Sequence, residues 1–163
     1  MALKVELKAG ERAIIGTAVI RNGEARAQLF IEGRTPILRE RDILTPATAD
    51  TPAKKIYLAV QVMYLDGTLD QHSRHYFPLV QEFLQAAPSA IDLVAEVNHC
   101  LLEGDLYRAL RAARRLIAYE SELITHALRG ERLHQGRAGH PLPAGARGGD
   151  PDEGRDSPAG ATR

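Results

Sequence analysis

The chain has 163 residues, and its 21 Lys and Arg are balanced by 21 Asp and Glu, so the formal net charge is zero. This balance excludes a strongly basic protein, and any nucleic-acid interface must rest on local placement of cations. The single cysteine, Cys100, excludes an internal disulfide framework and a multi-cysteine zinc site. No apolar run forms a signal core or approaches the roughly 18 residues of a membrane helix, so we expect a cytoplasmic protein without membrane contact.

The first part of the chain, residues 1–45, predicts a small antiparallel β domain. Apolar and charged residues alternate from Leu3 to Lys8, which is the period of two expected of a half-buried strand. Residues 12–21 carry branched apolar side chains around Gly16, and this pattern predicts a strand with a bulge or bend at the glycine.

A hairpin is expected next, because both residues of Asn22-Gly23 tolerate the positive φ of a type I′ turn. The predicted return strand covers residues 25–32, and a short last strand covers 37–39. A region of roughly 40 residues is marginal for an independent core, so it must pack on the helices, dimerise, or do both. The residues expected to supply its core are Val19, Leu29, Ile31 and Leu38.

Residues 51–128 change to the 3.6-residue period of helices and predict a four-helix α domain. Thr51 and Pro52 suit the N-cap and the first helical position, Gly67 follows the end of the first helix, and Asp105 suits the N-cap of the last. Pro78 marks either a first turn or a kink. The predicted helices cover residues 52–66, 71–86, 91–103 and 106–128.

The remaining residues, 129–163, are rich in Gly, Pro, Arg and Asp. They cannot bury enough apolar surface to offset chain entropy, which opposes ordering by on the order of 1–2 kcal/mol per residue, so we expect a disordered tail. The predicted fold is therefore α+β: a small N-terminal antiparallel β domain, a four-helix α domain and a disordered C-terminal tail.

Catalytic and metal-binding patterns are weak. His72 and His75 are three residues apart, but no further ligand lies nearby, so solvated side chains are the better interpretation. His99 and Cys100 are adjacent on a predicted helix, point about 100° apart and do not form a nucleophile pair. We therefore expect neither an enzyme nor a bound cofactor or metal.

Two basic features remain as candidate binding surfaces, each weighed against an ordinary solvated face. The last predicted helix places three arginines on one side, opposite its apolar stripe, where they suit phosphates or an acidic partner. These candidate partner-binding residues are Arg108, Arg111 and Arg115. The β region supplies the candidate RNA-binding residues Lys4, Lys8, Arg21, Arg26, Arg39 and Arg41.

Four blocks of the sequence together resemble the FlbT family of flagellum biosynthesis repressors. These blocks are LKVELKAGERAIIGTAVIRNG, ILRERDIL, DTPAKKIYLAVQVMYLD and EGDLYRALRAARRLIAYESEL, and they cover residues 2 to about 124. The resemblance implies a cytoplasmic post-transcriptional regulator that binds the 5′ untranslated leader of flagellin mRNA, lowers translation and promotes decay. It also implies a companion regulator, FlaF, which commonly opposes this activity.

The β region alone, KAGERAIIG followed by AVI, AQLFI and ILRERDI, is similar in rhythm to the carbon storage regulator family. That resemblance implies RNA contacts at Lys4 and at Arg39 with Arg41, and a homodimer formed through the β domain is left open. A second hypothesis is a protein-interaction adaptor, in which the helices bind flagellin, FlaF or another regulator and the effect on mRNA is indirect.

Overall fold

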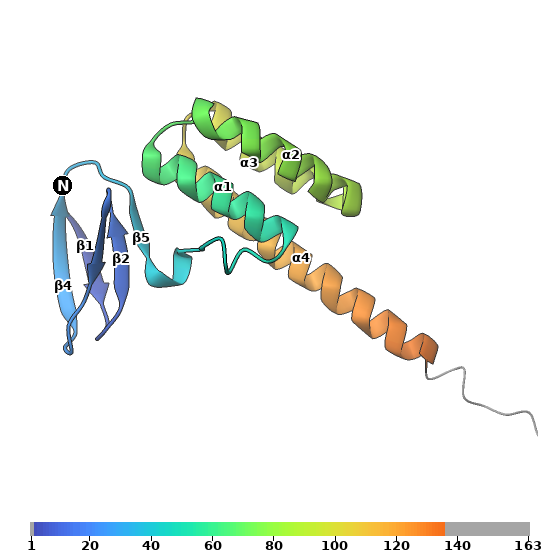
Figure 1. Ribbon diagram of the computed structural model, residues 1–163, viewed down its shortest axis with the longest axis horizontal. Helices are drawn as coiled ribbons and strands as arrows, with labels where there is room; N and C mark the ends of the chain where they lie inside the picture. Colours follow the sequence, from blue (N-terminus) through green and yellow to red (C-terminus); the bar gives the residue numbers. More distant parts are fainter. Residues whose placement is uncertain (1, 136–163) are drawn as a thin grey trace, which may run out of the picture. The chain divides into compact units, whose positions relative to one another are not determined.

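The computed structural model describes residues 2–135, in which five strands and four α-helices follow one another in chain order (Figure 1). Residues Met1–Ala127 form one compact unit, and a second unit begins at Leu128. The predicted order, antiparallel strands followed by four helices, is confirmed. The predicted disorder of the tail falls mainly on residues 136–163, which lie outside the described part of the chain.

The strands form two small antiparallel sheets. Strand β1 (Ala2–Leu7) pairs with β4 (Ala27–Glu32), while β2 (Arg12–Ile15) lies between β3 (Ala18–Arg21) and β5 (Ile37–Arg39). Alternate residues of β1 and β4 face a shared core, as the period of two predicts. This core contains Val5, Leu7 and Ala13, with Leu29, Ile31 and Ile37 packed against it.

Residues 12–21 form a hairpin, so the predicted single strand with a bulge is wrong. Ile15 pairs with Ala18, which leaves Gly16 and Thr17 as a two-residue turn. Gly16 has φ +61°, as the first position of a tight hairpin turn requires. A Cβ there would lie only 2.9 Å from Thr35 Oγ1, so glycine also permits close approach of the chain before β5.

The predicted hairpin turn at Asn22-Gly23 is also wrong, because β4 pairs with β1 and not with β3. The Asn22 side chain has a long-range role instead. Its Nδ2 donates to the carbonyl oxygens of Leu7 (3.2 Å), Lys8 (2.7 Å) and Ala25 (2.8 Å). These bonds tie the chain that leaves β3 to the end of β1, and they direct β4 back along β1.

Val19 is not part of the core, contrary to expectation: it is 68% exposed, whereas Leu38 is 3% exposed. Both residues lie on edge strands of the same sheet, Val19 on β3 and Leu38 on β5, with β2 between them. Leu38 is buried because β5 packs on the helical core. Apolar character alone does not tell which edge strand is covered.

The helices begin and end close to the predicted positions. They are α1 (Pro52–Asp66), α2 (Asp70–Ala86), α3 (Ile91–Leu102) and α4 (Leu106–Gln135). Thr51 Oγ1 accepts from Lys54 N at 3.4 Å, Gly67 takes the left-handed conformation after α1, and Asp105 Oδ1 accepts from Arg108 N at 3.0 Å. These are the local capping signals that the sequence carries.

Two details of the helices differ from, or sharpen, the expectation. Pro78 lies inside α2, which excludes the interpretation of Pro78 as a helix start. Helix α4 continues to Gln135, past its expected end at about Leu128. A single glycine, Gly130, costs a helix only about 1 kcal/mol, and the helix formers Glu131 and Arg132 follow it.

The helical core reaches the sheet through β5. Leu38 of β5 belongs to the same buried cluster as Ile56, Val60 and Leu116. Gln61 of α1 fixes the following segment, because its Nε2 donates to Leu44 O and its Oε1 accepts from Leu44 N, both at 2.8 Å. The sheet edge is therefore held against α1, and the chain after β5 passes beside α4.

Candidate functional site

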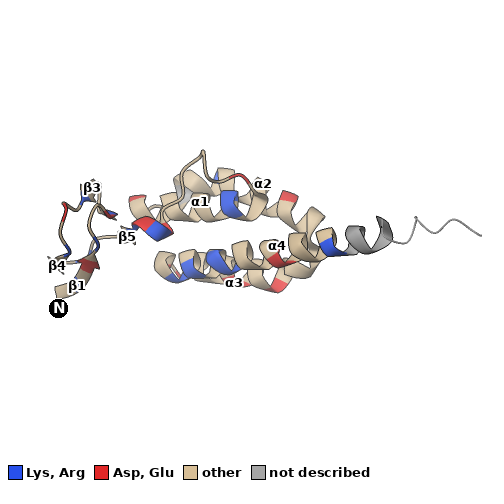
Figure 2. Ribbon diagram, turned by 90° about the horizontal axis from the view of Figure 1, so that it is seen from below, with Lys and Arg blue, Asp and Glu red and all other residues tan. Residues whose placement is uncertain are grey.

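A cleft of about 1210 Å³ lies where β1, β5 and the turn after β5 meet α1, α3 and α4. Six arginines line it, against the two acidic residues Asp42 and Glu96, so its formal charge is four units positive. In Figure 2 the arginines of α4 appear as blue bands near η1 (Glu40–Asp42), the charged turn after β5. We call this site the arginine cleft; its arginines are Arg39, Arg41, Arg108, Arg111, Arg114 and Arg115.

Two tyrosines of α1 hold β5 and η1 in place at the cleft. Tyr64 Oη accepts a hydrogen bond from Ile37 N at 3.0 Å, and Tyr57 Oη donates to Asp42 O at 2.7 Å. Burial, together with the nearby Asp42 charge, raises the pKa of Tyr57 to about 12. Tyr57 therefore stays protonated and remains a hydrogen-bond donor at physiological pH.

Arg39 is engaged within the fold. Its Nη2 donates to Glu6 O at 2.7 Å and to Glu11 Oε1 at 3.2 Å, so it links β1, the β1–β2 turn and β5. The hydrogen bond from Lys8 N lowers the pKa of Glu11, and the Arg39 charge adds to this effect against the opposing cost of burial. Arg39 Nε is buried and has no hydrogen-bond partner among the described residues.

The other cleft arginines differ in how firmly acidic residues hold them. Arg114 donates to Asp42 and to Arg41 O, and so joins α4 to η1. Arg115 donates to Glu96 of α3. Arg41 has only a 3.6 Å contact with Asp42, and its side chain is 72% exposed.

Arg108 and Arg111 complete the set. Arg108 lies 3.6 Å from Glu103 and 3.9 Å from Asp105, distances at which an exposed pair contributes little. Arg111 is exposed, and no acidic residue of the described chain pairs with it. Arg111 and Arg41 are thus the cleft cations most available to a ligand.

The structure brings together some of the candidate residues and leaves others apart. Arg39 and Arg41, predicted from the β region, meet the predicted helical stripe Arg108, Arg111 and Arg115. The other β-region candidates do not line the cleft: Lys4 contacts Glu6 at 3.6 Å, and Arg21 lies on the edge strand β3. These remaining candidates are Lys4, Lys8, Arg21 and Arg26.

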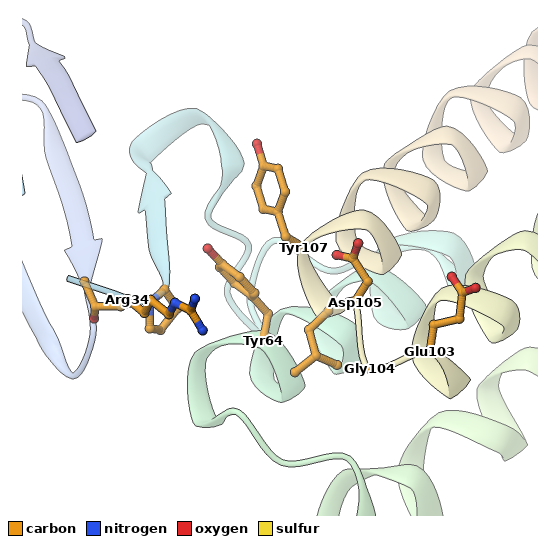
Figure 3. A pocket seen from close by; sticks show the side chains of 9 residues that line it. Arg34, Tyr64, Glu103, Gly104, Asp105 and Tyr107 are labelled. Carbon is orange, nitrogen blue, oxygen red and sulfur yellow. The ribbon is translucent and has the colours of Figure 1, made fainter. Parts of the chain in front are cut away.

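Sequence reasoning missed an aromatic pocket of about 510 Å³ that adjoins the cleft. Figure 3 shows Arg34 reaching toward Tyr64 from the β side, while Tyr107 and Asp105 project from the start of α4. The two tyrosine rings lie 5.9 Å apart, centroid to centroid, at 47°. A signal was present, because Tyr107 and Arg111 are four residues apart and share a helix face.

Among the side chains that the structure describes, no three His, Cys, Asp or Glu residues are grouped so as to hold a metal ion. His72 Nε2 instead contacts the single carboxylate of Asp66 at 2.8 Å. None of the helices in the described range has the length and apolar character needed to cross a membrane.

The fold and the cleft define a small α+β protein built around a cationic cleft between sheet and helices. The sequence matches the model of the flagellar protein FlbT family over residues 3–124. The chain belongs to this family, so the resemblance carried by the four sequence blocks is confirmed. No solved structure matches the chain significantly.

Relatives cover most of the described chain. The probable flagellum biosynthesis repressor protein FlbT 1 of Bradyrhizobium diazoefficiens is 55% identical over 124 residues, which cover 76% of this chain and 85% of that protein. The probable repressor FlbT of Rhodopseudomonas palustris strain TIE-1 is 45% identical over 77% of this chain and 99% of its own length. The flagellum biosynthesis repressor FlbT of Caulobacter vibrioides strain CB 15 is 34% identical over 80% of this chain and 94% of its own length.

Proposed function

We propose that this protein represses flagellum biosynthesis after transcription, by binding the 5′ untranslated leader of flagellin mRNA and promoting its decay. The names of its relatives support repression of flagellum biosynthesis. The observation that supports RNA as the direct target is the arginine cleft, where two basic segments distant in sequence meet. Six arginines line this one cleft, although the net charge of the whole chain is zero.

The physical argument rests on local charge. A cleft with one sign of charge and low-dielectric walls concentrates the electric field, and it attracts phosphates even when the whole protein is neutral. Arginine also suits this role because its planar guanidinium donates to phosphate oxygens through two parallel hydrogen bonds. The cleft cations most available to a ligand, Arg41 and Arg111, are the proposed phosphate contacts.

Salt dependence tests this proposal. Each phosphate contact with single-stranded RNA contributes roughly −0.7 to the slope of log affinity against log salt. Purified protein is titrated with the flagellin leader RNA and a scrambled control across a salt series. Arg41→Gln combined with Arg111→Gln is expected to weaken binding and flatten the slope by about 1.4. Arg74→Gln, which removes an exposed cation of α2 outside the cleft, is the matched control and should leave both values unchanged.

The measured affinities and salt slopes test both direct recognition of the leader and the cleft as the RNA site. Leader-selective binding that depends on Arg41 and Arg111 supports direct regulation through the cleft. Wild-type protein that binds leader and scrambled RNA equally, or neither, would contradict direct recognition of the leader. An unchanged affinity and slope in the double variant would contradict the cleft as the RNA site. The half-life of flagellin mRNA in cells carrying the double variant tests decay and should increase.

A second candidate function, an adaptor that acts through a protein partner, is favoured by a separate surface. An apolar groove of about 390 Å³ opens between α1, α2 and α3. Phe77 and Leu102 border it and are 60% and 83% exposed, so the groove has an apolar rim open to a partner. The partners proposed for it are flagellin and a FlaF-type regulator.

This alternative predicts binding without RNA. Purified flagellin or FlaF-type regulator, treated with ribonuclease, should be captured by the protein and lost with Leu102→Asp. Arg111→Gln should have no effect on that capture. If neither purified partner binds at micromolar concentration, the adaptor hypothesis fails for both.

A further inference from the structure

We propose that the aromatic pocket beside the arginine cleft is a nucleobase subsite, in which one unpaired base of a single-stranded RNA stacks on Tyr107. This inference rests on the proposed function, because it names the part of the RNA that the site would recognise. It assigns the arginines to phosphates and the tyrosine to a base. The RNA is therefore expected to be single-stranded at this point, since the bases of a duplex are stacked on their neighbours and have no free face.

The first supporting observation is an exposed aromatic ring on a fixed support. Tyr107 is 52% exposed although it is a large side chain at the start of a long helix. Its ring packs against Tyr64, at a centroid distance of 5.9 Å. Tyr64 is itself held by the hydrogen bond between its hydroxyl and Ile37 N, so the support does not depend on a ligand. A stacking surface fixed in advance loses little conformational entropy on binding.

The second observation is continuity between the pocket and the cleft. Thr35, Tyr64 and Tyr107 line both openings, so a ligand can pass from one into the other. Tyr107 and Arg111 lie four residues apart on α4, which places a ring and an unpaired cation one helical turn apart. Grooves that bind single strands combine these two elements, aromatic side chains for bases and a cationic path for the backbone.

The third observation concerns the pocket's own polar groups. Arg34 enters from the chain before β5, while Asp105 and Glu103 lie on the opposite side (Figure 3). The Asp105 and Glu103 side chains are 42% and 46% exposed, so their outer oxygens can accept from a base amino group. A pocket with an aromatic ring, a cation and carboxylates offers both a stacking face and donors and acceptors for a base edge.

An acidic peptide is the main competing ligand for an arginine cleft, and the pocket argues against it. Glutamate and aspartate side chains would use the arginines but have no aromatic face to place on Tyr107. The two carboxylates of the pocket would also repel an acidic chain at the point where the cleft continues. A nucleotide satisfies both parts, because its phosphate is anionic and its base is flat, uncharged and hydrogen-bonding.

The experiment compares the flagellin leader RNA with inorganic polyphosphate, a polyanion that carries phosphates but neither bases nor sugars. Affinities are measured for the full chain as wild type, Tyr107→Leu, Tyr107→Phe and Arg111→Gln. Phe30→Leu is the matched control, because it removes an exposed aromatic ring of β4 that lines neither the cleft nor the pocket. Thermal unfolding of each variant checks that the fold is retained.

The expected pattern distinguishes the base from the phosphate. Tyr107→Leu should weaken leader binding by roughly 5- to 150-fold, the range for loss of one base stack, with an unchanged salt slope. It should leave polyphosphate binding unchanged, while Tyr107→Phe and Phe30→Leu should behave as wild type with both ligands. Arg111→Gln should weaken both ligands and flatten the salt slope.

Three results would overturn the subsite, and they differ in what else they overturn. If Arg111→Gln weakens leader binding but Tyr107→Leu does not, the base subsite is wrong and the RNA function stands. If the wild type binds polyphosphate but not leader RNA, both the subsite and the RNA function are wrong. If Tyr107→Leu also weakens polyphosphate, its effect is on the arginines and not on a base.

Discussion

The buried carboxylate of Glu120 makes a strong test of how the helices are held together. Glu120 lies on α4 and is only 8% exposed. Its Oε1 accepts from Ala53 N at 3.1 Å, and its Oε2 accepts from the hydroxyl of Thr51. One side chain of α4 therefore caps the first turn of α1, where backbone N–H groups lack helical partners and the helix dipole favours negative charge.

The cost of removing this carboxylate can be estimated from its partners. Ala53 is fully buried, so after Glu120→Ala its N–H cannot easily bond to water instead. A hydrogen bond to a charged group contributes about 1.5–3 kcal/mol, and a buried donor left unpaired costs about 1–3 kcal/mol. Allowing for overlap between these terms, we expect a loss of about 3 kcal/mol. Glu120→Gln keeps an acceptor but removes the charge, so we expect a loss of about 1–1.5 kcal/mol.

Urea and thermal unfolding measure these values. A loss of about 3 kcal/mol corresponds to a fall in Tm of about 10 °C for a domain of this size. Glu122→Ala, which removes an exposed carboxylate two residues along the same helix, is the control and should change stability by less than about 0.5 kcal/mol. A Glu120→Ala variant as stable as this control would refute the reasoning that α4 caps α1.

Three further predictions follow from the fold. Asn22→Ala should destabilise the protein by about 2–3 kcal/mol because three hydrogen bonds are lost; a loss below 0.5 kcal/mol in urea would show that they contribute little. Gly16→Ala should destabilise the protein by about 1–2 kcal/mol, because Gly16 has a positive φ and an added Cβ would lie 2.9 Å from Thr35 Oγ1. Gly23→Ala is the control and should be close to neutral, because an added Cβ there has no atom within 4 Å. Equal effects of the two substitutions on stability would contradict this account. The pKa of Tyr57 is raised from 10.0 to about 12 in the folded protein, so the unfolded chain loses this proton at lower pH. The free energy of unfolding should therefore fall as pH rises from 10 to 12. Urea unfolding across this pH range should show a smaller fall for Tyr57→Phe.

Local signals were sufficient where a structure is stabilised by neighbours in sequence. Thr51 and Pro52 start α1, and Gly67 ends it, as predicted, because Thr51 and Gly67 bond to Lys54 N and Met63 O, only three or four positions away. The short strand at 37–39 was also predicted with its observed bounds. Family membership could be inferred from sequence for a related reason, since its four blocks lie along the chain in order.

Local sequence signals predicted the wrong turn where the pairing of strands depended on residues distant in the sequence. Asn22-Gly23 has the composition of a hairpin turn, yet the Asn22 side chain bonds to the end of β1 and β4 pairs with β1. Gly16 and Thr17 make the real hairpin turn. The pairing is decided by which strands bury Leu29 and Ile31, and that choice involves residues more than twenty positions apart.

The candidate site shows the same division most clearly. The sequence determined that the chain has two basic segments, one near Arg39 and Arg41 and one from Arg108 to Arg115, within a neutral protein. Only the tertiary structure brought them to one cleft, with Tyr107 beside it, and engaged Arg39 with Glu11. The physical reason is that charge and period are properties of neighbouring residues, whereas ion pairs, burial and clefts depend on which distant surfaces the apolar core draws together.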